Sequence, residues 1–435
     1  MSIAAAYIRA APELPFLLSE GRQITREQVA RLVESFGQDI SARRVVVVVT
    51  HTPDAAQIVA ALAACEESHV PIVLAHPTLQ DEDVRALCRT VGARVFLNSS
   101  LEWVSVPDAV EGKRCAFTVS LMTSGTTGRP KLVRHNLESL LGRIPRSAGS
   151  TTNCGQRWLL SYQPTTFAGL QVILTALCTG AAVVQTSNRS PSELFAVAEQ
   201  FATTHISGTP TFWRSFLLAA PPESLPLKQI TLGGEAVDQP TLDRLAQRFP
   251  EARITHIYAS TEAGALFSVH DGRAGFPRAW LHGKDAGVGL RIRAGVLEVE
   301  SPRRMLGYEG ESTPTLTDDG WLITGDLVRV DGDRVHFQGR SDDILNIGGA
   351  KVYPQEVEEF LLSCPGVTEV RVRSISNPMS GQLLAADVVL APGYEPDVHR
   401  VELMRLCQST LPSHKAPRRI RVVPEIPMRD SGKKA

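Results

Sequence analysis

The stretch LMTSGTTGRPKLVRHN, from Leu121 to Asn136, combines small hydroxyl residues and glycines with one lysine. Gly125 and Gly128 let backbone N–H groups approach an anion closely, and Lys131 adds a positive charge. Hydroxyl groups add further donors, on Thr123, Ser124, Thr126 and Thr127. This composition predicts a loop that holds phosphates, with a plain mobile surface loop as the alternative. The spacing does not fit the Walker A pattern, which argues against a P-loop phosphotransferase.

Outward from this loop, the chain alternates between patterns typical of helices and of buried strands. Thr25 and Gln28 have the spacing of a capping box at the start of an amphipathic helix. The run RRVVVVVT, residues 43–50, is typical of a strand buried on both faces. The same alternation continues to about residue 260, which predicts an α/β fold with helices covering the faces of the sheets. Ligands of such folds gather at the carboxyl ends of the strands.

The pattern changes after about Val288, where period-two alternation and turn pairs such as Asp331-Gly332 predict antiparallel β structure. A loop, a helix and further strands then follow Arg340. We therefore expect a large N-terminal domain of α/β sheets with a small β-rich subdomain over residues 1–340. A small mobile α+β domain is expected over residues 341–435.

Composition and charge exclude several classes of protein. The 435 residues carry a formal net charge of −1, so no global basic field favours nucleic acid. No run reaches the roughly 18 apolar residues of a membrane span. Seven cysteines are scattered without metal-ligand or disulfide spacing, and no histidine pairs with a serine-nucleophile motif. We expect a cytoplasmic protein without a zinc site or a catalytic triad.

Five motifs follow one another in a fixed order, and together they resemble the adenylate-forming superfamily. This superfamily comprises acyl-CoA synthetases, aryl-acid ligases and the adenylation domains of peptide synthetases. The motifs are TSGTTGRPK (123–131), YASTEAG (258–264), TGD (324–326), GRSDDILNIGGAKVYPQEVE (339–358) and SGKK (431–434). The resemblance extends from about residue 40 onward, and the region before the phosphate loop is shorter than is usual for these enzymes.

The resemblance implies a nucleotide site that binds ATP. Residues 123–131 would wrap the β- and γ-phosphates, and the ring of Tyr258 would stack on adenine. Thr261 would contact the α-phosphate, and Asp326, supported by Arg340, would accept hydrogen bonds from the ribose. The remaining adenine-site and nucleotide-site residues implied are Gly233, Gly234, Glu235, Ala236, Ala259 and Ser260.

The resemblance also implies a metal ligand and two lysines that act in different steps. Glu262 would hold Mg²⁺, which prefers oxygen ligands. Lys433 would meet the substrate carboxylate and the α-phosphate during adenylation, and Lys351 would enter the site when a thiol attacks the adenylate. Asp342 would be the hinge between these two states. The plainer alternatives are a helix-cap acid at Glu262, a turn former at Asp326, a turn at Lys351 and a frayed terminus at Lys433.

Substrate choice is expected in the segments that line the crevice beside Tyr258. Peptide-synthetase domains for α-amino acids place an aspartate where this chain has Phe167, and an unpaired buried ammonium is costly, so an α-amino acid is disfavoured. An apolar slot for an aryl or acyl acid is predicted instead, with a hydroxybenzoate as the specific guess. Its predicted lining is Phe167, Gly169, Leu170, Gly208, Thr209, Pro210, Ser260 and Gly264.

We therefore expect an ATP-dependent, AMP-forming acid–thiol ligase. Its cofactors would be ATP and Mg²⁺, and its acceptor the thiol of CoA or of the phosphopantetheine on an acyl carrier protein. A fatty-acyl-CoA synthetase is one alternative, and a non-catalytic acyl-adenylate sensor is another. The basic stretch HKAPRRIRVVPEIP, residues 414–427, suggests contact with a carrier protein or CoA phosphates, although a solvated strand face is the favoured interpretation.

Overall fold

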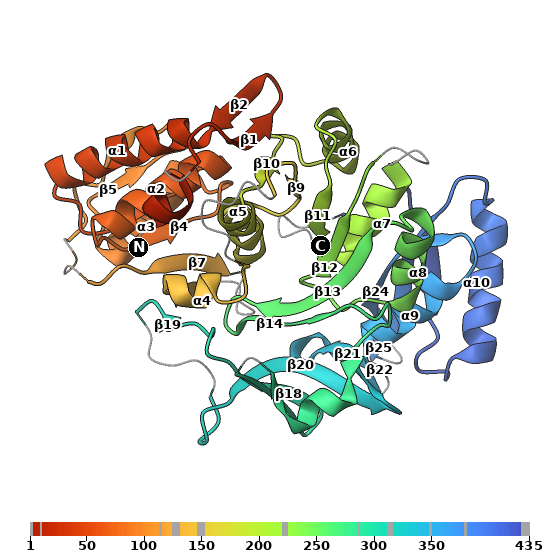
Figure 1. Cartoon of the computed structure of the whole chain (residues 1–435). Helices are drawn as coiled ribbons and strands as arrows, with labels where there is room; N and C mark the ends of the chain where they lie inside the picture. The colour runs from red at the N-terminus through yellow and green to blue at the C-terminus, as the bar shows by residue number, and fades with distance from the viewer. Residues whose placement is uncertain are drawn as a thin grey trace.

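Two large mixed sheets, each with a parallel centre, form the body of the molecule (Figure 1). The computed structural model describes residues 3–8, 11–110, 112, 115–123, 131–145, 153–219, 225–285, 287–310, 316–347, 350–377 and 381–427. Among the helices in these ranges, none combines the length and apolar character needed to cross a bilayer.

The first sheet has seven strands in the order β19-β8-β7-β4-β3-β5-β6, and its central strands β7, β4, β3 and β5 are parallel. The strands are β3 (Val48–Thr50), β4 (Ile72–Leu74), β5 (Val95–Leu97), β6 (Trp103–Ser105), β7 (Val119–Thr123), β8 (Lys131–His135) and β19 (Gly307–Tyr308). Its helices are α1 (Arg26–Ala42), α2 (Ala55–Glu67), α3 (Asp81–Val91) and α4 (Leu137–Leu141).

The structure confirms the predicted capping box at the start of α1 and shortens the strand predicted after it. The capping box is confirmed, since the Thr25 side chain accepts from the Gln28 backbone N–H and the Gln28 side chain accepts from the Thr25 backbone N–H. The strand predicted over residues 43–50 is too long, because β3 begins only at Val48. Arg43 ends α1 with its N–H bonded to carbonyls of the last turn, and Arg44 takes a positive φ of 52°.

The second sheet has eight strands in the order β14-β13-β12-β11-β9-β10-β1-β2, and only its two edge pairings are antiparallel. The strands are β1 (Pro15–Ser19), β2 (Arg22–Thr25), β9 (Arg157–Leu160), β10 (Ala182–Val184), β11 (His205–Gly208), β12 (Gln229–Gly233), β13 (Arg253–Ser260) and β14 (Gly264–Val269). Its helices are α5 (Phe167–Thr179), α6 (Pro191–Gln200), α7 (Pro210–Ala219) and α8 (Gln239–Arg248). Helix α5 lies between the two sheets, and its apolar residues share one core with α1 and α2 (Figure 1).

A third sheet, of six strands, lies below the others in Figure 1 and is the expected β-rich subdomain. Its strands are β15 (Phe276–Pro277), β16 (Lys284–Asp285), β17 (Val288–Arg293), β18 (Val296–Glu300), β20 (Leu322–Asp331) and β21 (Arg334–Arg340). All its pairings are antiparallel. The mixed α/β architecture predicted from the sequence is confirmed.

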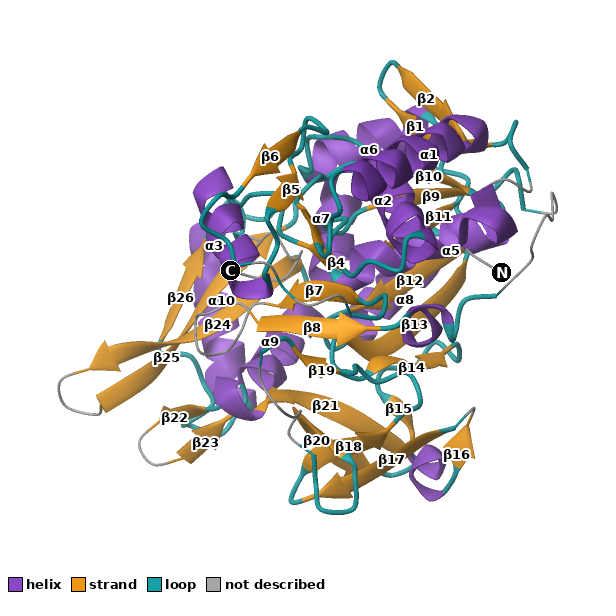
Figure 2. Ribbon diagram, turned by 90° about the vertical axis from the view of Figure 1, so that its left-hand side faces the viewer, coloured by secondary structure: helices purple, strands orange, loops and turns teal. Residues whose placement is uncertain are grey.

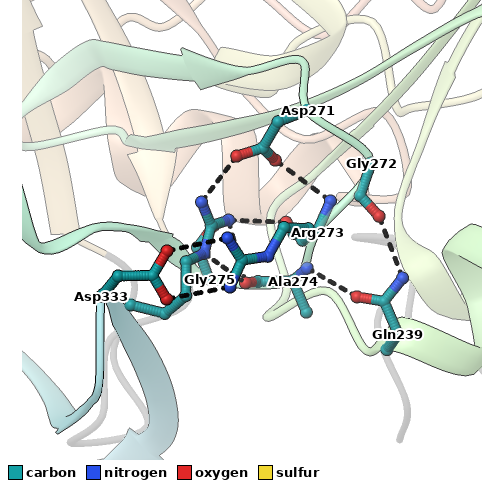
Figure 3. Close-up of polar contacts among 8 residues, drawn as sticks. Gln239, Asp271, Gly272, Arg273, Ala274, Gly275 and Asp333 are labelled. Carbon is teal, nitrogen blue, oxygen red and sulfur yellow. Dashed lines mark hydrogen bonds and ion pairs between the residues drawn. The ribbon is translucent and has the colours of Figure 1, made fainter.

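A buried arginine ties this third sheet to the loop that leaves β14 (Figure 3). Arg334 at the start of β21 pairs with Asp271 at 2.7 Å and donates to the carbonyls of residues 273–275. Arg273 pairs with Asp333, and Gln239 of α8 bonds the backbone of residues 272 and 274. These bonds fix β20 and β21, which carry Asp326 and Arg340, against the larger sheet.

The last part of the chain builds its own core. Helices α9 (Pro354–Ser363) and α10 (Pro396–Thr410) accompany the sheet formed by β24 (Val367–Asn377), β25 (Gly381–Leu390) and β26 (Arg419–Val422). A separate hairpin, β22 (Leu345–Ile347) with β23 (Ala350–Val352), precedes α9. Because the buried cluster here contains only residues after 344, it is consistent with a boundary near residues 340 and 341, which stays a prediction.

Candidate active site

The predicted site segments are delivered by the carboxyl ends of β7, β12 and β13, where ligands of α/β sheets bind. Thr123 is the last residue of β7, Gly233 the last of β12, and Tyr258 lies near the end of β13. Thr123 pairs in register with Lys131, so the antiparallel strands β7 and β8 flank the predicted phosphate loop. Residues 124–130 of this loop, with the predicted Ser124, Gly125, Thr126, Thr127 and Gly128, lie outside the described residues.

Tyr258, Asp326 and Arg340 form one polar cluster. The Tyr258 hydroxyl donates a hydrogen bond to Asp326, and Arg340 pairs with the other carboxylate oxygen at 3.2 Å. Burial, followed by the charge of Asp326, raises the pKa of Tyr258 well above its usual value, so the hydroxyl stays a donor. The aromatic rings of Phe267 and Phe337 pack beside Tyr258, with centroids 5.3 and 4.8 Å away. The cluster thus holds a carboxylate acceptor, 17% exposed, in a fixed position.

Glu262 is connected to the phosphate-loop hairpin through Tyr308 on β19. The Tyr308 hydroxyl donates to Glu262 Oε1 at 3.4 Å, and the Lys131 ammonium lies 4.9 Å from the centre of the Tyr308 ring. A cation over a tyrosine face is held by the ring quadrupole. The main chain around Glu262 is also fixed, because Met305 N–H donates to its carbonyl at 2.8 Å. The structure thus places Tyr308 between Lys131 and Glu262, and Thr261 precedes Glu262 in the same turn.

His135 is a site-proximal residue that the sequence reasoning missed. It ends β8, has no exposed surface, and its Nε2 lies 2.8 Å from the carbonyl oxygen of Thr261. A carbonyl only accepts, so Nε2 carries the proton, and Nδ1 lies 3.0 Å from the Ser139 hydroxyl. Burial lowers the pKa of His135 to about 4, which keeps the ring neutral. The sequence offered one indication, that His135 lies within the stretch from Leu121 to Asn136. The sequence alone does not show whether a histidine there is buried or exposed.

Glu235, predicted in the adenine site, turns its side chain to α7. Its carboxylate accepts from the backbone N–H of Thr211 at 3.1 Å and from the Thr211 hydroxyl at 2.7 Å. Arg214 then donates to Thr211 and pairs with Asp238 at 2.8 Å. An acid at this helix N-terminus is favourable. The side chain of Glu235 therefore has a structural partner, and a nucleotide contact there would use the backbone of residues 233–236.

The predicted pocket residues divide by exposure. Phe167 begins α5, is 7% exposed, and its ring lies 5.6 Å from that of His135. Leu170 and Thr209 are at most 1% exposed, so their side chains do not line an open surface. Gly208 must be glycine, because an added Cβ would lie 2.1 Å from the Phe212 ring. Pro210 follows as the first residue of α7, and Gly169 is buried in the first turn of α5.

The β13–β14 turn also depends on a glycine. Gly264 has a φ of +74°, and an added Cβ would lie 2.4 Å from the carbonyl oxygen of Arg303. Ser260 accepts from the Ala263 N–H at 3.0 Å, which closes the turn that carries Thr261 and Glu262. The geometry therefore restricts this turn to a backbone conformation that glycine adopts readily.

The residues predicted to move are exposed or lie outside the described ranges. Asp342 is exposed in a single 3₁₀ turn, Ser341–Asp343, and Lys351 is exposed on β23 opposite Asn346. Among the described residues Lys351 has no hydrogen bond or ion pair. Lys433 falls in the undescribed residues 428–435. No group of three or more His, Cys, Asp or Glu side chains in the described ranges has the arrangement of a metal site.

Comparison with known proteins identifies the family. A family model described as "AMP-binding enzyme" matches residues 113–302, and the "AMP-binding enzyme C-terminal domain" matches residues 356–433. A 2-succinylbenzoate–CoA ligase of Bacillus pumilus is 31% identical, over 73% of this chain and 67% of its own length. The chain belongs to the AMP-binding enzyme family.

Other relatives of this AMP-binding family member are more distant. A p-hydroxybenzoic acid–AMP ligase, FadD22, of Mycobacterium tuberculosis is 26% identical over 88% of the chain, which spans only 59% of the FadD22 length. Solved structures under 25% identical share the fold. They include a benzoate CoA ligase from Burkholderia xenovorans (TM-score 0.81, 20% identity, 100% of this chain and 98% of that one). An anthranilate CoA ligase bound to anthranoyl-AMP gives a TM-score of 0.81 at 21% identity, over 100% and 95%.

Proposed function

We propose that the chain is an ATP-dependent acid–thiol ligase that forms an acyl-AMP intermediate from an aryl or acyl carboxylic acid. The observation that carries this proposal is the Asp326 carboxylate, held by Tyr258 and Arg340 beside the turn of Thr261 and Glu262. A fixed, partly buried carboxylate is a good acceptor for two ribose hydroxyls. Tyr258, Ala259 and the backbone of residues 233–236 would then surround adenine.

In the first step a substrate carboxylate oxygen attacks the α-phosphorus of ATP. The bond to pyrophosphate breaks, and acyl-AMP and pyrophosphate are the products. Two anions must approach each other, so correct placement and positive charge supply most of the catalysis. Lys131 and the backbone of residues 123–131 would hold the leaving phosphates, Thr261 the α-phosphate, and Lys433 the attacking carboxylate.

Glu262 fits Mg²⁺ that arrives with ATP. Mg²⁺ in phosphoryl-transfer sites is held by one or two carboxylates together with substrate phosphates, and does not need an all-protein cage. Glu262 supplies one carboxylate, and its hydrogen bond from Tyr308 engages only Oε1. Bound there, Mg²⁺ would neutralise charge on the phosphates. The absence of a three-ligand cluster among the described residues agrees with this kind of site.

In the second step a thiol attacks the acyl carbon and AMP leaves. We assign this step to a state in which residues 341–435 rotate about Asp342 and bring Lys351 to the adenylate. The acceptor would be CoA or the phosphopantetheine of a carrier protein. The exposure of Asp342 and Lys351 in the present arrangement supports such a movement, because neither is held by described contacts with the site.

An aromatic acid is the favoured substrate, and a hydroxybenzoate the specific proposal. Phe167 provides an apolar side chain, packed beside the His135 ring, where peptide-synthetase domains for α-amino acids place an aspartate. FadD22 and the succinylbenzoate ligase are named for aromatic acids, which supports the same class.

The test is pyrophosphate release with ATP and Mg²⁺, without a thiol, with hydroxylamine to trap the adenylate. The panel should hold benzoates, cinnamates, fatty acids and α-amino acids. We expect turnover with benzoates and little with amino acids. Preference for long-chain fatty acids would favour the fatty-acyl alternative. No pyrophosphate release with any acid of the panel, although ATP still binds, would favour a non-catalytic sensor.

A further inference from the structure

The three-stranded sheet of the C-terminal part presents four arginines on one face. Residues that are paired across adjacent strands point to the same face of a sheet. Here such paired residues form two rows that run across the three strands. The first row is Arg371, Asp387 and Arg421, and the second is Arg373, Ala385 and Arg419. We call Arg371, Arg373, Arg419 and Arg421 the arginine face.

The opposite side of the sheet is the buried one. Alternate residues on the same strands pack with α9 and α10 in a single core, and they include Val370, Val372, Ala386, Val388 and Ile420. Figure 2 shows the sheet of β24, β25 and β26 with these helices. Because side chains alternate along a strand, the arginine face points away from that core.

Positive charge dominates the accessible part of this face. Asp387 is buried and receives hydrogen bonds from Arg421 at 2.7 Å and Arg373 at 3.2 Å. Burial alone would raise the pKa of Asp387, but these two bonds outweigh it and hold the pKa below its usual value. Glu369, at the end of the same face, is buried and accepts from Ser215 of α7. Both carboxylates are therefore committed to internal bonds.

Two of the four arginines have no partner of their own in the described part of the chain. Arg419 is exposed and Arg371 half-buried, and neither has a hydrogen bond or ion pair there. Arg421 remains 46% exposed despite its bond to Asp387. An ordinary solvated face mixes both signs of charge. Here the accessible charged groups are all guanidinium groups, which suit bidentate contacts with carboxylates.

We propose that the arginine face docks an acidic protein that carries the acceptor thiol. This inference rests on the proposed function. Strands β24 and β26 lie two strand spacings apart, about 10 Å, and the two rows are about 7 Å apart. One phosphate group cannot bridge four cations spread in this way. Carboxylates at i and i+4 on a partner helix lie about 6 Å apart and match the rows. Such complementarity accelerates association and selects the partner.

The test compares charge reversals on and off the face. The double variant Arg371→Glu with Arg419→Glu removes the two arginines without described partners, so little folding cost is expected. Arg405→Glu is the control, since Arg405 is exposed on α10, which covers the opposite side of the sheet. Circular dichroism and thermal unfolding would verify that both variants fold.

Three activities should be measured: thiol-free pyrophosphate release, transfer to CoA, and transfer to a purified phosphopantetheinylated carrier protein. We expect kcat/KM for the carrier to fall tenfold or more in the double variant, with a weaker salt dependence. The other two activities, and all three in Arg405→Glu, should stay within twofold. Unchanged carrier transfer would refute the proposal. An equal loss with CoA would also refute it and would assign the face to CoA phosphates.

Failure of the proposed function gives a different pattern. If the unmodified protein forms no adenylate with any acid, the ligase proposal fails while docking remains measurable. Direct titration of the carrier protein into the unmodified chain and the double variant then decides. Binding that weakens at least tenfold in the double variant supports the docking face, and equal binding or none overturns it.

Discussion

The hydroxyl of Tyr258, at the end of β13 in the eight-stranded sheet, donates to the carboxylate of Asp326 on β20 of the six-stranded sheet. Two sheets that fold from segments almost 70 residues apart are joined at this point. The bond orients Asp326 while Arg340 neutralises it. The acceptor proposed for the ribose is thus set by both sheets together.

Replacing Tyr258 by Phe should weaken ATP binding while the fold is retained. The ring still packs beside Phe267 and Phe337, but Asp326 loses a charge-assisted donor worth about 1–3 kcal/mol. We expect KM for ATP to rise roughly tenfold, since about 1.4 kcal/mol corresponds to a factor of ten. Tyr394→Phe, in the C-terminal part, is the matched control. An unchanged KM in Tyr258→Phe would show that the hydroxyl does not position Asp326.

His135 should act as a positioning residue for the Thr261–Glu262 turn. Replacing it by Leu removes the donor to the Thr261 carbonyl and leaves that partly buried oxygen without this partner, at a cost of about 1–3 kcal/mol. We expect His135→Leu to lower kcat of adenylation and to raise the Mg²⁺ concentration needed for half-maximal rate. His135→Gln can restore the donor, so partial rescue is expected. If His135→Leu and His135→Gln have equal kcat and the same Mg²⁺ dependence, His135 acts only by packing and not as a hydrogen-bond donor.

Buried histidines should make the protein less stable in acid. Burial lowers the pKa of His135, His205 and His256 to about 4 each. The unfolded chain, with an ordinary value near 6.5, binds more protons, so stability falls as pH drops from about 6.5 towards 4. Each histidine should contribute about 1–3 kcal/mol of this loss. Urea midpoints at pH 7.5, 6 and 5 measure it, and a flat profile would contradict the expectation.

The two lysines should separate the half-reactions. Lys433→Ala should reduce adenylate formation on the order of 100-fold, because a cation that stabilises the transition state is lost. It should spare transfer from a supplied acyl-adenylate. Lys351→Ala should do the reverse. Pyrophosphate release and thioester formation are measured separately, and equal damage to one half-reaction by both variants would rule out the two-state model.

Arg244 of α8 should hold the C-terminal part in its present position. Its guanidinium donates to the carbonyls of Leu362 in α9 at 3.1 Å and of Val367, the first residue of β24, at 2.7 Å. Arg244→Met should weaken this docking by about 1–3 kcal/mol. Faster trypsin cleavage after the exposed Arg340 and an altered ratio of the two half-reaction rates are expected. Arg248→Met on the same helix is the control, and identical cleavage rates in the two variants would refute this role.

Short-range residue patterns in the sequence were enough to predict the fold class, the capping box at Thr25 and the β-rich segment after Val288. Each depends on short-range periodicity, which depends little on tertiary contacts. The motif order was enough to indicate the family. The sequence analysis named Gly264 only as part of the YASTEAG motif and as a pocket residue, and the structure shows that an added Cβ there would approach the carbonyl of Arg303.

Only the tertiary structure decided which side chains meet. Tyr308 reaches Glu262 because β19 pairs with β8, a pairing between residues about 170 positions apart that no local pattern records. His135 becomes a candidate positioning residue only because the structure places its Nε2 against the Thr261 carbonyl. The arginine face arises because β26 pairs parallel to β25, which aligns Arg419 and Arg421 with Arg373 and Arg371. Sequence determines what each segment prefers, whereas long-range register determines what lies beside it.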